Sequence, residues 1–324
     1  MTSVLRAGPA AAVQETVCVM VPTFRRPATL AALLRALRAQ TVKRVGVELL
    51  VVDNDAAQSA RALVESSRHE LPFPVHYLCV ETPGLCAVRN AGLEFARRRF
   101  RFVAMVDDDE IPEPQWLEEL LRTQARTGAA AVIGPVPARL PPEAPAWIRA
   151  GKFFDLPTFP DQAIIADGYT GNCLIDLDAA SSDGLAFDAK LNLAGGEDQL
   201  FFRELIARGG RIAYAARAVA PELVAAARVN ARYLVRLSFR RGNTLWFCDR
   251  RIHGRRAPML ARRVALALGR IALGAVMLVP RAIVSGRAGV VRSLCDAARG
   301  AGTLAGLCGI TYLHYRRAPA GSGE

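Results

Sequence analysis

The chain has 324 residues, of which 52% are hydrophobic, and a formal net charge of +12 at pH 7. This length can bury a sizeable core in one large domain, or in one domain with an appendage. Seven scattered cysteines, an odd number with no C-x-x-C pair, argue against a disulfide framework or a zinc site and favour reduced, mostly buried thiols.

The positive charge gathers at one end of the chain. Residues 228–317 hold 18 arginines and two acids, for a net charge of +16, whereas residues 1–227 carry −3. Residues 1–15 are Ala-rich and lack the pattern of an export signal, so we expect a flexible leader there. The sequence therefore predicts a near-neutral body at 16–250 and a basic tail at 251–324.

Strand and helix signals alternate along the first half of the body. Buried strands are expected at Val17–Val21, Val47–Val52, Val75–Val80, in the run ending at Asp107, and at Ala130–Val136. Helices are expected from Pro27 and at residues 57–68, 85–99 and 114–127. Short connections between such units predict a mostly parallel α/β sheet with helices on both faces. No glycine-rich phosphate loop follows the first strand, which argues against a dinucleotide enzyme or a P-loop ATPase.

The second half of the body changes character. Residues 137–168 contain six prolines, a composition typical of an irregular, ligand-binding segment. A strand is expected at Tyr169–Asp176, and a helix after Gly195-Gly196-Glu197-Asp198. We therefore divide the body into two halves, at about 16–136 and about 137–250.

Three consecutive aspartates, Asp107, Asp108 and Asp109, follow an apolar strand. Carboxylates so close together repel one another unless a cation neutralises them. Ligands collect at the carboxyl ends of strands in open α/β sheets, so the cluster suits a divalent metal shared with a nucleotide diphosphate. The alternative is a solvated acidic turn that precedes the next helix.

Five motifs occur in a fixed order. They are Val-Pro-Thr-Phe-Arg-Arg-Pro at 21–27, Val-Val-Asp-Asn-Asp at 51–55, Val-Arg-Asn-Ala-Gly at 88–92, the aspartates with Glu110, and Gly-Gly-Glu-Asp at 195–198. In this order they resemble the inverting family 2 glycosyltransferases of the GT-A fold. The Asp-Asn-Asp-Ala, Gly-Tyr-Thr and Arg-x-Gly-x-Thr elements and the apolar basic tail look most like bacterial exopolysaccharide glucosyltransferases of succinoglycan type. The resemblance spans about residues 16–250 and implies that residues at about 16–136 form a donor half and residues at about 137–250 an acceptor half.

Glycosyl transfer assigns roles to the acidic motifs. The leaving diphosphate gains charge as its bond to the sugar breaks, so Mg²⁺ or Mn²⁺ held by Asp109 would stabilise it, with Asp107 or Asp108 near the ribose and the metal. The acceptor hydroxyl must lose a proton, and Asp198 is the expected base, supported by Glu197. The alternative for Asp198 is a carboxylate that only complements the helix dipole.

Further residues are expected to bind the two substrates. For the nucleotide sugar, the resemblance implicates Pro22, Thr23, Arg25, Asp53 and Arg89. Asp53 would accept the uracil imide proton, although it could be a simple turn residue, and Arg89 could equally lie on the surface. The expected acceptor contacts are Trp147, Thr170, Asn172 and Arg240, with a core position as the alternative for Trp147.

One position departs from the resemblance. Relatives commonly carry a histidine near residue 219 that can join the metal site, whereas Pro221 occupies the matching position here. Either Glu222 replaces the histidine, or Asp109, diphosphate oxygens and water hold the metal.

The tail contains two apolar stretches, Val264–Val279 and Gly300–Tyr315, both short for a spanning helix. Flanking arginines favour helices that lie in a membrane surface, and the alternative is packing onto the catalytic domain. Nucleic acid is not expected as a partner, because the basic residues lack interleaved aromatic platforms.

The sequence thus predicts a hexosyltransferase, most simply one that moves glucose from UDP-glucose to a polyprenyl-diphosphate-linked oligosaccharide. It would act at the cytoplasmic face of a bacterial inner membrane, as a peripheral or monotopic protein, with other polysaccharide assembly proteins as further candidate partners. Another sugar or acceptor, a nucleotidyltransferase and a catalytically silent sugar-nucleotide-binding module are the alternatives.

Overall fold

The first strand shows how the sequence builds two cores. In β1 (Thr16–Thr23) successive side chains point to opposite faces, so Cys18 and Met20 enter one hydrophobic core, and Val17 and Val19 enter the other. The computed structural model describes residues 16–43, 45–180, 184–192, 195–254, 256–310 and 312. The predicted leader at 1–15 lies outside these residues.

Eight strands form the central sheet in the order β3-β2-β1-β4-β8-β5-β9-β7. Strands β1 to β4 are parallel to one another, as are β5 and β9, while β8 runs antiparallel between β4 and β5, and β7 is antiparallel to β9. The expected mostly parallel α/β sheet is confirmed. The strands after β1 are β2 (Gly46–Asp53), β3 (Val75–Cys79), β4 (Phe102–Val106), β5 (Ala131–Ile133), β7 (Ile164–Ile165), β8 (Asn172–Asp176) and β9 (Ile212–Tyr214).

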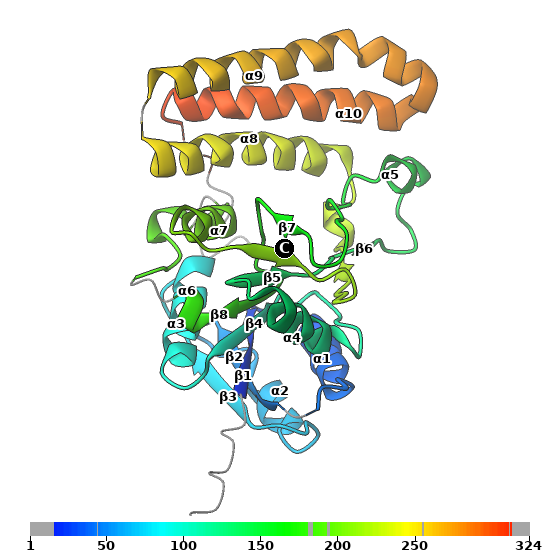
Figure 1. Cartoon of the computed structure of the whole chain (residues 1–324). Coiled ribbons are helices and arrows are strands. Elements are labelled where there is room, and N and C mark those ends of the chain that lie inside the picture. Colours follow the sequence, from blue (N-terminus) through cyan, green and yellow to red (C-terminus); the bar gives the residue numbers. More distant parts are fainter. Residues whose placement is uncertain are drawn as a thin grey trace, which may run out of the picture.

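Helices cover both faces of the sheet (Figure 1). One core lies beneath α3 and α7, and the other beneath α1, α2 and α4. A small parallel pair of strands, β6 (Ala138–Arg139) and β10 (Glu222–Leu223), lies beside the end of β4. There the backbones of Glu110 and Glu222 form an isolated antiparallel β-bridge. The helices of the body are α1 (Pro27–Arg38), α2 (Arg61–Ser67), α3 (Leu85–Arg97), α4 (Trp116–Thr127), α5 (Ala146–Gly151), α6 (Leu177–Ala180) and α7 (Glu197–Ala207), with 3₁₀ turns at Ala189–Leu191 and Ala226–Arg228.

Three long helices form a layer beyond α7 (Figure 1). They are α8 (Ala231–His253), α9 (Ala257–Val276) and α10 (Leu278–Leu307). Glycines let α10 approach both neighbours: a Cβ built on Gly242 of α8 would lie 2.0 Å from the carbonyl oxygen of Arg299, and one on Gly274 of α9 would lie 2.5 Å from that of Ser293. The predicted boundary between residues 250 and 251 falls inside α8, a helix that also belongs to this layer.

The chain turns a corner between α9 and the main part of α10. The axes of α9 and α10 differ by 74°, and Gly286 then interrupts α10 with φ +53°, a conformation that favours glycine. Within the described ranges, no individual helix has the length and apolar character to cross a bilayer, although α9 and α10 taken together reach that threshold by length and composition.

Candidate active site

The carboxylates that follow β4 are crowded and largely buried. Asp108 and Glu110 are 5% and 4% exposed, respectively. Burial, together with repulsion from Asp107 and Glu222, raises the pKa of Asp109 to about 7. Burial also raises the pKa of Glu110 well above its usual value. The predicted cluster therefore exists in three dimensions, and it attracts positive charge.

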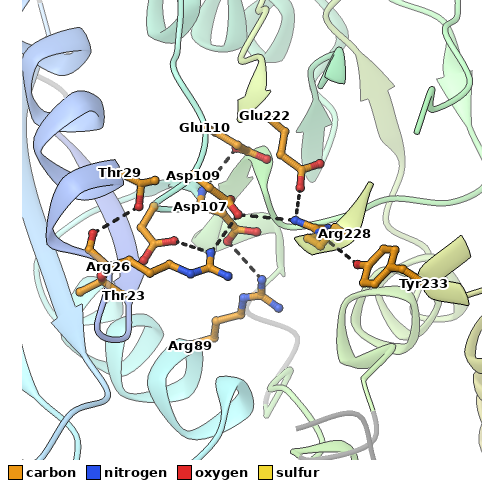
Figure 2. A network of polar contacts seen from close by, with 11 residues as sticks. Thr23, Arg26, Thr29, Arg89, Asp107, Asp109, Glu110, Glu222, Arg228 and Tyr233 are labelled. Atoms are coloured by element: carbon orange, nitrogen blue, oxygen red, sulfur yellow. Dashed lines mark hydrogen bonds and ion pairs between the residues drawn. The ribbon is translucent and has the colours of Figure 1, made fainter. Parts of the chain in front are cut away.

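Two arginines supply part of that charge (Figure 2). Arg26, from the loop after β1, donates to Asp108 Oδ1 at 3.1 Å and to Asp109 Oδ2 at 2.8 Å. Arg228 Nη1 lies 2.6 Å from Glu222 Oε1 and 3.7 Å from Asp109 Oδ2. The Nε of Arg228 donates to the Tyr233 hydroxyl at 2.8 Å, which fixes the guanidinium beside the aspartates.

Arg26 was not among the residues expected in the site. The sequence did hold an indication of its position, because Arg26 directly follows Arg25, which was expected to bind the nucleotide sugar. Strand β1, which precedes Arg26, also pairs directly with β4, which precedes the aspartates. Arg228 was not expected in the site either, and nothing in its neighbours indicated that its side chain would reach Asp109.

A buried arginine joins the aspartates to the start of α7. Arg89 of α3 is 3% exposed; its Nη1 donates to Glu197 Oε1 at 2.6 Å and its Nη2 to Asp107 Oδ1 at 3.3 Å. Arg89 is therefore not a surface residue, and burial of its guanidinium favours support of the two carboxylates over the predicted contact with the nucleotide. Motifs more than 100 residues apart meet in this way.

The first turn of α7 presents two carboxylates in different surroundings. Glu197 is 5% exposed and burial raises its pKa, whereas Asp198 is only partly buried. Gly196, with φ +87°, lets the chain pass under α8, since a Cβ there would lie 1.7 Å from Thr244 Cγ2. Asp198 is thus the more accessible carboxylate, held at a helix start whose dipole favours its charge.

Arg240 also lies at this end of α7. A Cβ built on Gly195 would lie 3.6 Å from Arg240 Nη1, and the positive charge of Arg240 acts on Glu197. The predicted role of Arg240 in acceptor binding stays a prediction.

The residues predicted to bind the nucleotide sugar are of two kinds: Thr23 and Arg25 pair with aspartates, whereas Asp53 is fully buried. Thr23, beside Pro22 at the end of β1, donates to Asp108 Oδ2 at 2.8 Å, and Arg25 pairs with Asp55 at 3.1 Å. Asp53 is fully buried, and its carboxylate accepts the backbone N–H groups of residues 55 and 60 and the Tyr77 hydroxyl. Asp53 has no exposed surface here and braces the loop after β2, and its contact with uracil stays a prediction.

Asn172, which was predicted to contact the acceptor, is also buried. It has no exposed surface; its Oδ1 accepts the indole N–H of Trp116 at 2.7 Å, and its Nδ2 donates to the carbonyl oxygens of Pro135 and Ala218. These bonds hold β8, α4 and the segment after β5 together. These partners are remote along the chain, so the sequence could not show them, and the acceptor contact of Asn172 stays a prediction.

Of the two remaining predicted acceptor residues, Thr170 is buried and Trp147 is partly buried. Thr170 is 1% exposed, and its hydroxyl has no hydrogen-bond partner among the described residues. Trp147 of α5 contacts Phe153 edge to face at 5.7 Å, and the Arg287 guanidinium of α10 lies 5.0 Å from its ring centre. Trp147 therefore connects α5 to the tail, which is the core-like alternative.

The site offers few metal ligands. The described residues contain no group of three or more His, Cys, Asp or Glu side chains placed to hold a metal. Glu222 and Asp109 both lie close to Arg228, whose guanidinium sits between their carboxylates. Asp109, with raised pKa and excess negative charge around it, fits a cation only if non-protein oxygens complete the coordination.

The chain is similar in sequence to known proteins. Residues 18–182 match the family model described as Glycosyl transferase family 2. Over 225 residues, 69% of this chain and 72% of the relative, the sequence is 41% identical to the succinoglycan biosynthesis protein ExoM of Rhizobium meliloti.

Solved structures show the same fold. The mannosyltransferase PcManGT from Pyrobaculum calidifontis, in complex with GDP-Man and Mn²⁺, has a TM-score of 0.60 at 17% identity, over 90% of this chain and 86% of that chain. TarS 1-349 of S. aureus in complex with UDP has a TM-score of 0.51 at 16% identity, over 91% of this chain and 92% of that chain. The architecture is the GT-A fold.

Proposed function

Because the chain belongs to glycosyltransferase family 2, we propose that it transfers glucose from UDP-glucose, with inversion, to a lipid-linked oligosaccharide during exopolysaccharide synthesis. The name of the relative ExoM supports the exopolysaccharide role. The UDP complex of TarS supports a UDP donor, whereas the GDP-Man complex of PcManGT makes a GDP-sugar the competing donor class.

One observation carries the proposal: the pair of hydrogen bonds from Arg89 to Asp107 and Glu197. It brings the donor half, with its acidic strand end, against the helix start that bears Asp198. A donor bound over Asp107–Asp109 would then have its sugar near Asp198. An acceptor hydroxyl that enters between them can attack the anomeric carbon from the face opposite the diphosphate.

The reaction is a single displacement. Asp198 accepts the proton of the acceptor hydroxyl, a bond forms between that oxygen and the anomeric carbon, and the bond to the UDP oxygen breaks. Glu197, paired with Arg89, holds the first turn of α7 in place. Arg228, and Arg26 if it leaves Asp108 and Asp109, can face the departing diphosphate.

Asp109 is the residue that would hold a divalent cation, Mg²⁺ or Mn²⁺, with diphosphate oxygens and water as the remaining ligands. When bound, the cation would supply positive charge to the leaving diphosphate. We place the reaction at the cytoplasmic face of a bacterial inner membrane, where the lipid-linked acceptor and other assembly proteins would be found.

A donor screen tests the proposal. The protein is incubated with a polyprenyl-diphosphate-linked oligosaccharide and with UDP-glucose, UDP-galactose, UDP-N-acetylglucosamine or GDP-mannose, and nucleoside diphosphate release is measured. We expect UDP release from UDP-glucose and, by NMR, a β-linked product. Release of pyrophosphate, an α-linked product, or preference for GDP-mannose would each contradict the proposal.

A further inference from the structure

The corner between α9 and α10 exposes large apolar side chains. Val276 and Val279 are 67% and 65% exposed, and Ile283 and Val284 are 80% and 83% exposed. We call residues 276–284 the apolar corner. Each of these side chains stands mostly in solvent, which is costly for a surface that has no partner.

The outer side of α9 continues the apolar surface. Leu266, Leu268 and Leu273 are 46%, 53% and 44% exposed. Between Arg262 and Arg287, a stretch described in full, none of the exposed residues is charged. The surface therefore runs along the whole second half of α9 and around the corner.

Helix α8 and the part of α10 that follows Gly286 are not free to take part. In Figure 1, α10 lies between α8 and α9, and α8 faces α7. A Cβ on Gly302 of α10 would lie 2.0 Å from the carbonyl oxygen of Phe239 of α8, and one on Gly300 would lie 2.4 Å from that of Ala267 of α9. If α10 left this position to span a bilayer, both of these contacts would break. We therefore expect the layer to lie against a surface.

The charge around the apolar surface selects the kind of partner. The two acids of the layer formed by α8, α9 and α10 are already paired, Asp249 with Arg203 at 3.0 Å and Asp296 with Arg281 at 2.6 Å. Arginines border the surface at both ends, and Arg256, Arg262 and Arg287 are exposed. An apolar surface with a purely cationic border matches the acyl region and the anionic headgroups of a bilayer.

We propose that the apolar corner enters one leaflet of an anionic bilayer and that the outer side of α9 lies along the same leaflet, without crossing it. This inference deepens the proposed function by naming the surface that meets the membrane. It does not depend on the donor or the acceptor, because binding to vesicles can be measured without turnover.

The test uses the full-length protein and sucrose-loaded vesicles of phosphatidylethanolamine and phosphatidylglycerol. The variant carries Ile283→Asp and Val284→Asp, and it should bind these vesicles about 100-fold more weakly than the wild type, since two apolar side chains would be replaced by charges. The control is Ile164→Asp, which alters a 54% exposed residue in β7 of the catalytic domain and should leave vesicle binding unchanged.

Three further measurements complete the design. Phosphatidylcholine vesicles should bind the wild type at least about tenfold more weakly, because the arginines lose their anionic partners. Ile283→Ser with Val284→Ser provides a milder variant, and thermal unfolding checks that both variants fold. Sedimentation velocity without lipid measures the oligomeric state.

Two outcomes would overturn the inference. Wild-type affinity in the doubly substituted, folded variants would show that another surface meets the lipid. The second outcome is a wild-type protein that does not bind anionic vesicles but forms a dimer, together with substituted variants that are monomers. It would show that the surface binds a second copy of the chain. A failed donor screen would leave these results unaffected, so the two proposals fail separately.

Discussion

Replacement of Arg89 by methionine should disable the enzyme by leaving a carboxylate without its partner. Arg89 and Glu197 have side chains that are only 4% and 6% exposed, and Glu197 Oε2 has no hydrogen-bond partner among the described residues. Arg89→Met therefore leaves the buried carboxylate of Glu197 without its ion-pair partner and with almost no access to water. Loss of one partner of such a pair costs about 3–5 kcal/mol in the free energy of unfolding.

A double-mutant cycle separates this loss from simple packing. Glu197→Gln removes the negative charge and should cost only about 1–2 kcal/mol. The combined variant should therefore be more stable than the sum of the single losses by about 2 kcal/mol. Arg98→Met is the matched control, because Arg98 lies next to the end of the same helix in an ion pair whose side chains are 74% and 69% exposed. It should change the free energy of unfolding by less than about 0.5 kcal/mol.

Activity gives a second measurement on the same variants. If Arg89 positions the start of α7, the value of kcat for UDP release should fall about 100-fold in Arg89→Met, as expected for a displacement of about 1 Å. Urea unfolding and initial-rate kinetics measure both quantities. An Arg89→Met protein as stable and as active as Arg98→Met would refute the reasoning.

Three further substitutions test single roles. Asp198→Asn should lower kcat by about 1,000-fold while the Kd for UDP, measured by calorimetry, stays unchanged; near-normal turnover would remove Asp198 as the base. Asp109→Ala should abolish any increase in UDP affinity that Mg²⁺ or Mn²⁺ produces. If the wild type and this variant bound UDP equally well in the presence of the metal, Asp109 would not be its ligand. Asn172→Ala should lower the free energy of unfolding by about 2–4 kcal/mol, since it leaves the Trp116 N–H without its acceptor. Its acceptor KM should not change, and a raised KM at normal stability would support the predicted acceptor contact.

The regular elements of the body were largely predictable. The strand predicted at Val47–Val52 is β2 (Gly46–Asp53), and the helix predicted at 114–127 is α4 (Trp116–Thr127). Such segments are specified by local hydrophobic periodicity, which a single sequence displays. The insertion of β8 between β4 and β5 was not predictable, because strand order depends on pairing between remote segments.

The site was predictable in its motifs but not in the division of labour among residues. The acidic cluster was singled out because three aspartates follow an apolar strand, and the Glu-Asp pair was singled out because it belongs to the five motifs that carry the family resemblance. Asp53 and Asn172 share that polar character, yet their hydrogen bonds are satisfied internally by Tyr77 and Trp116. A sequence shows that a polar group is present, but only the fold shows whether water or ligand can reach it.

The position of α10 bears on how the protein could be made tractable for crystallography. Asn243 of α8 donates to the carbonyl oxygens of Gly302 and Ile310, and a Cβ on Gly306 would lie 3.1 Å from the ring of Trp246, which is 4% exposed. Cutting the chain after α8 would uncover these groups on a helix whose first turns, through Tyr233 and Arg228, also support the aspartates. The tail is therefore not a detachable module. A detergent-free form of the enzyme should be sought by exchanging outward-facing side chains at the corner, with every helix retained.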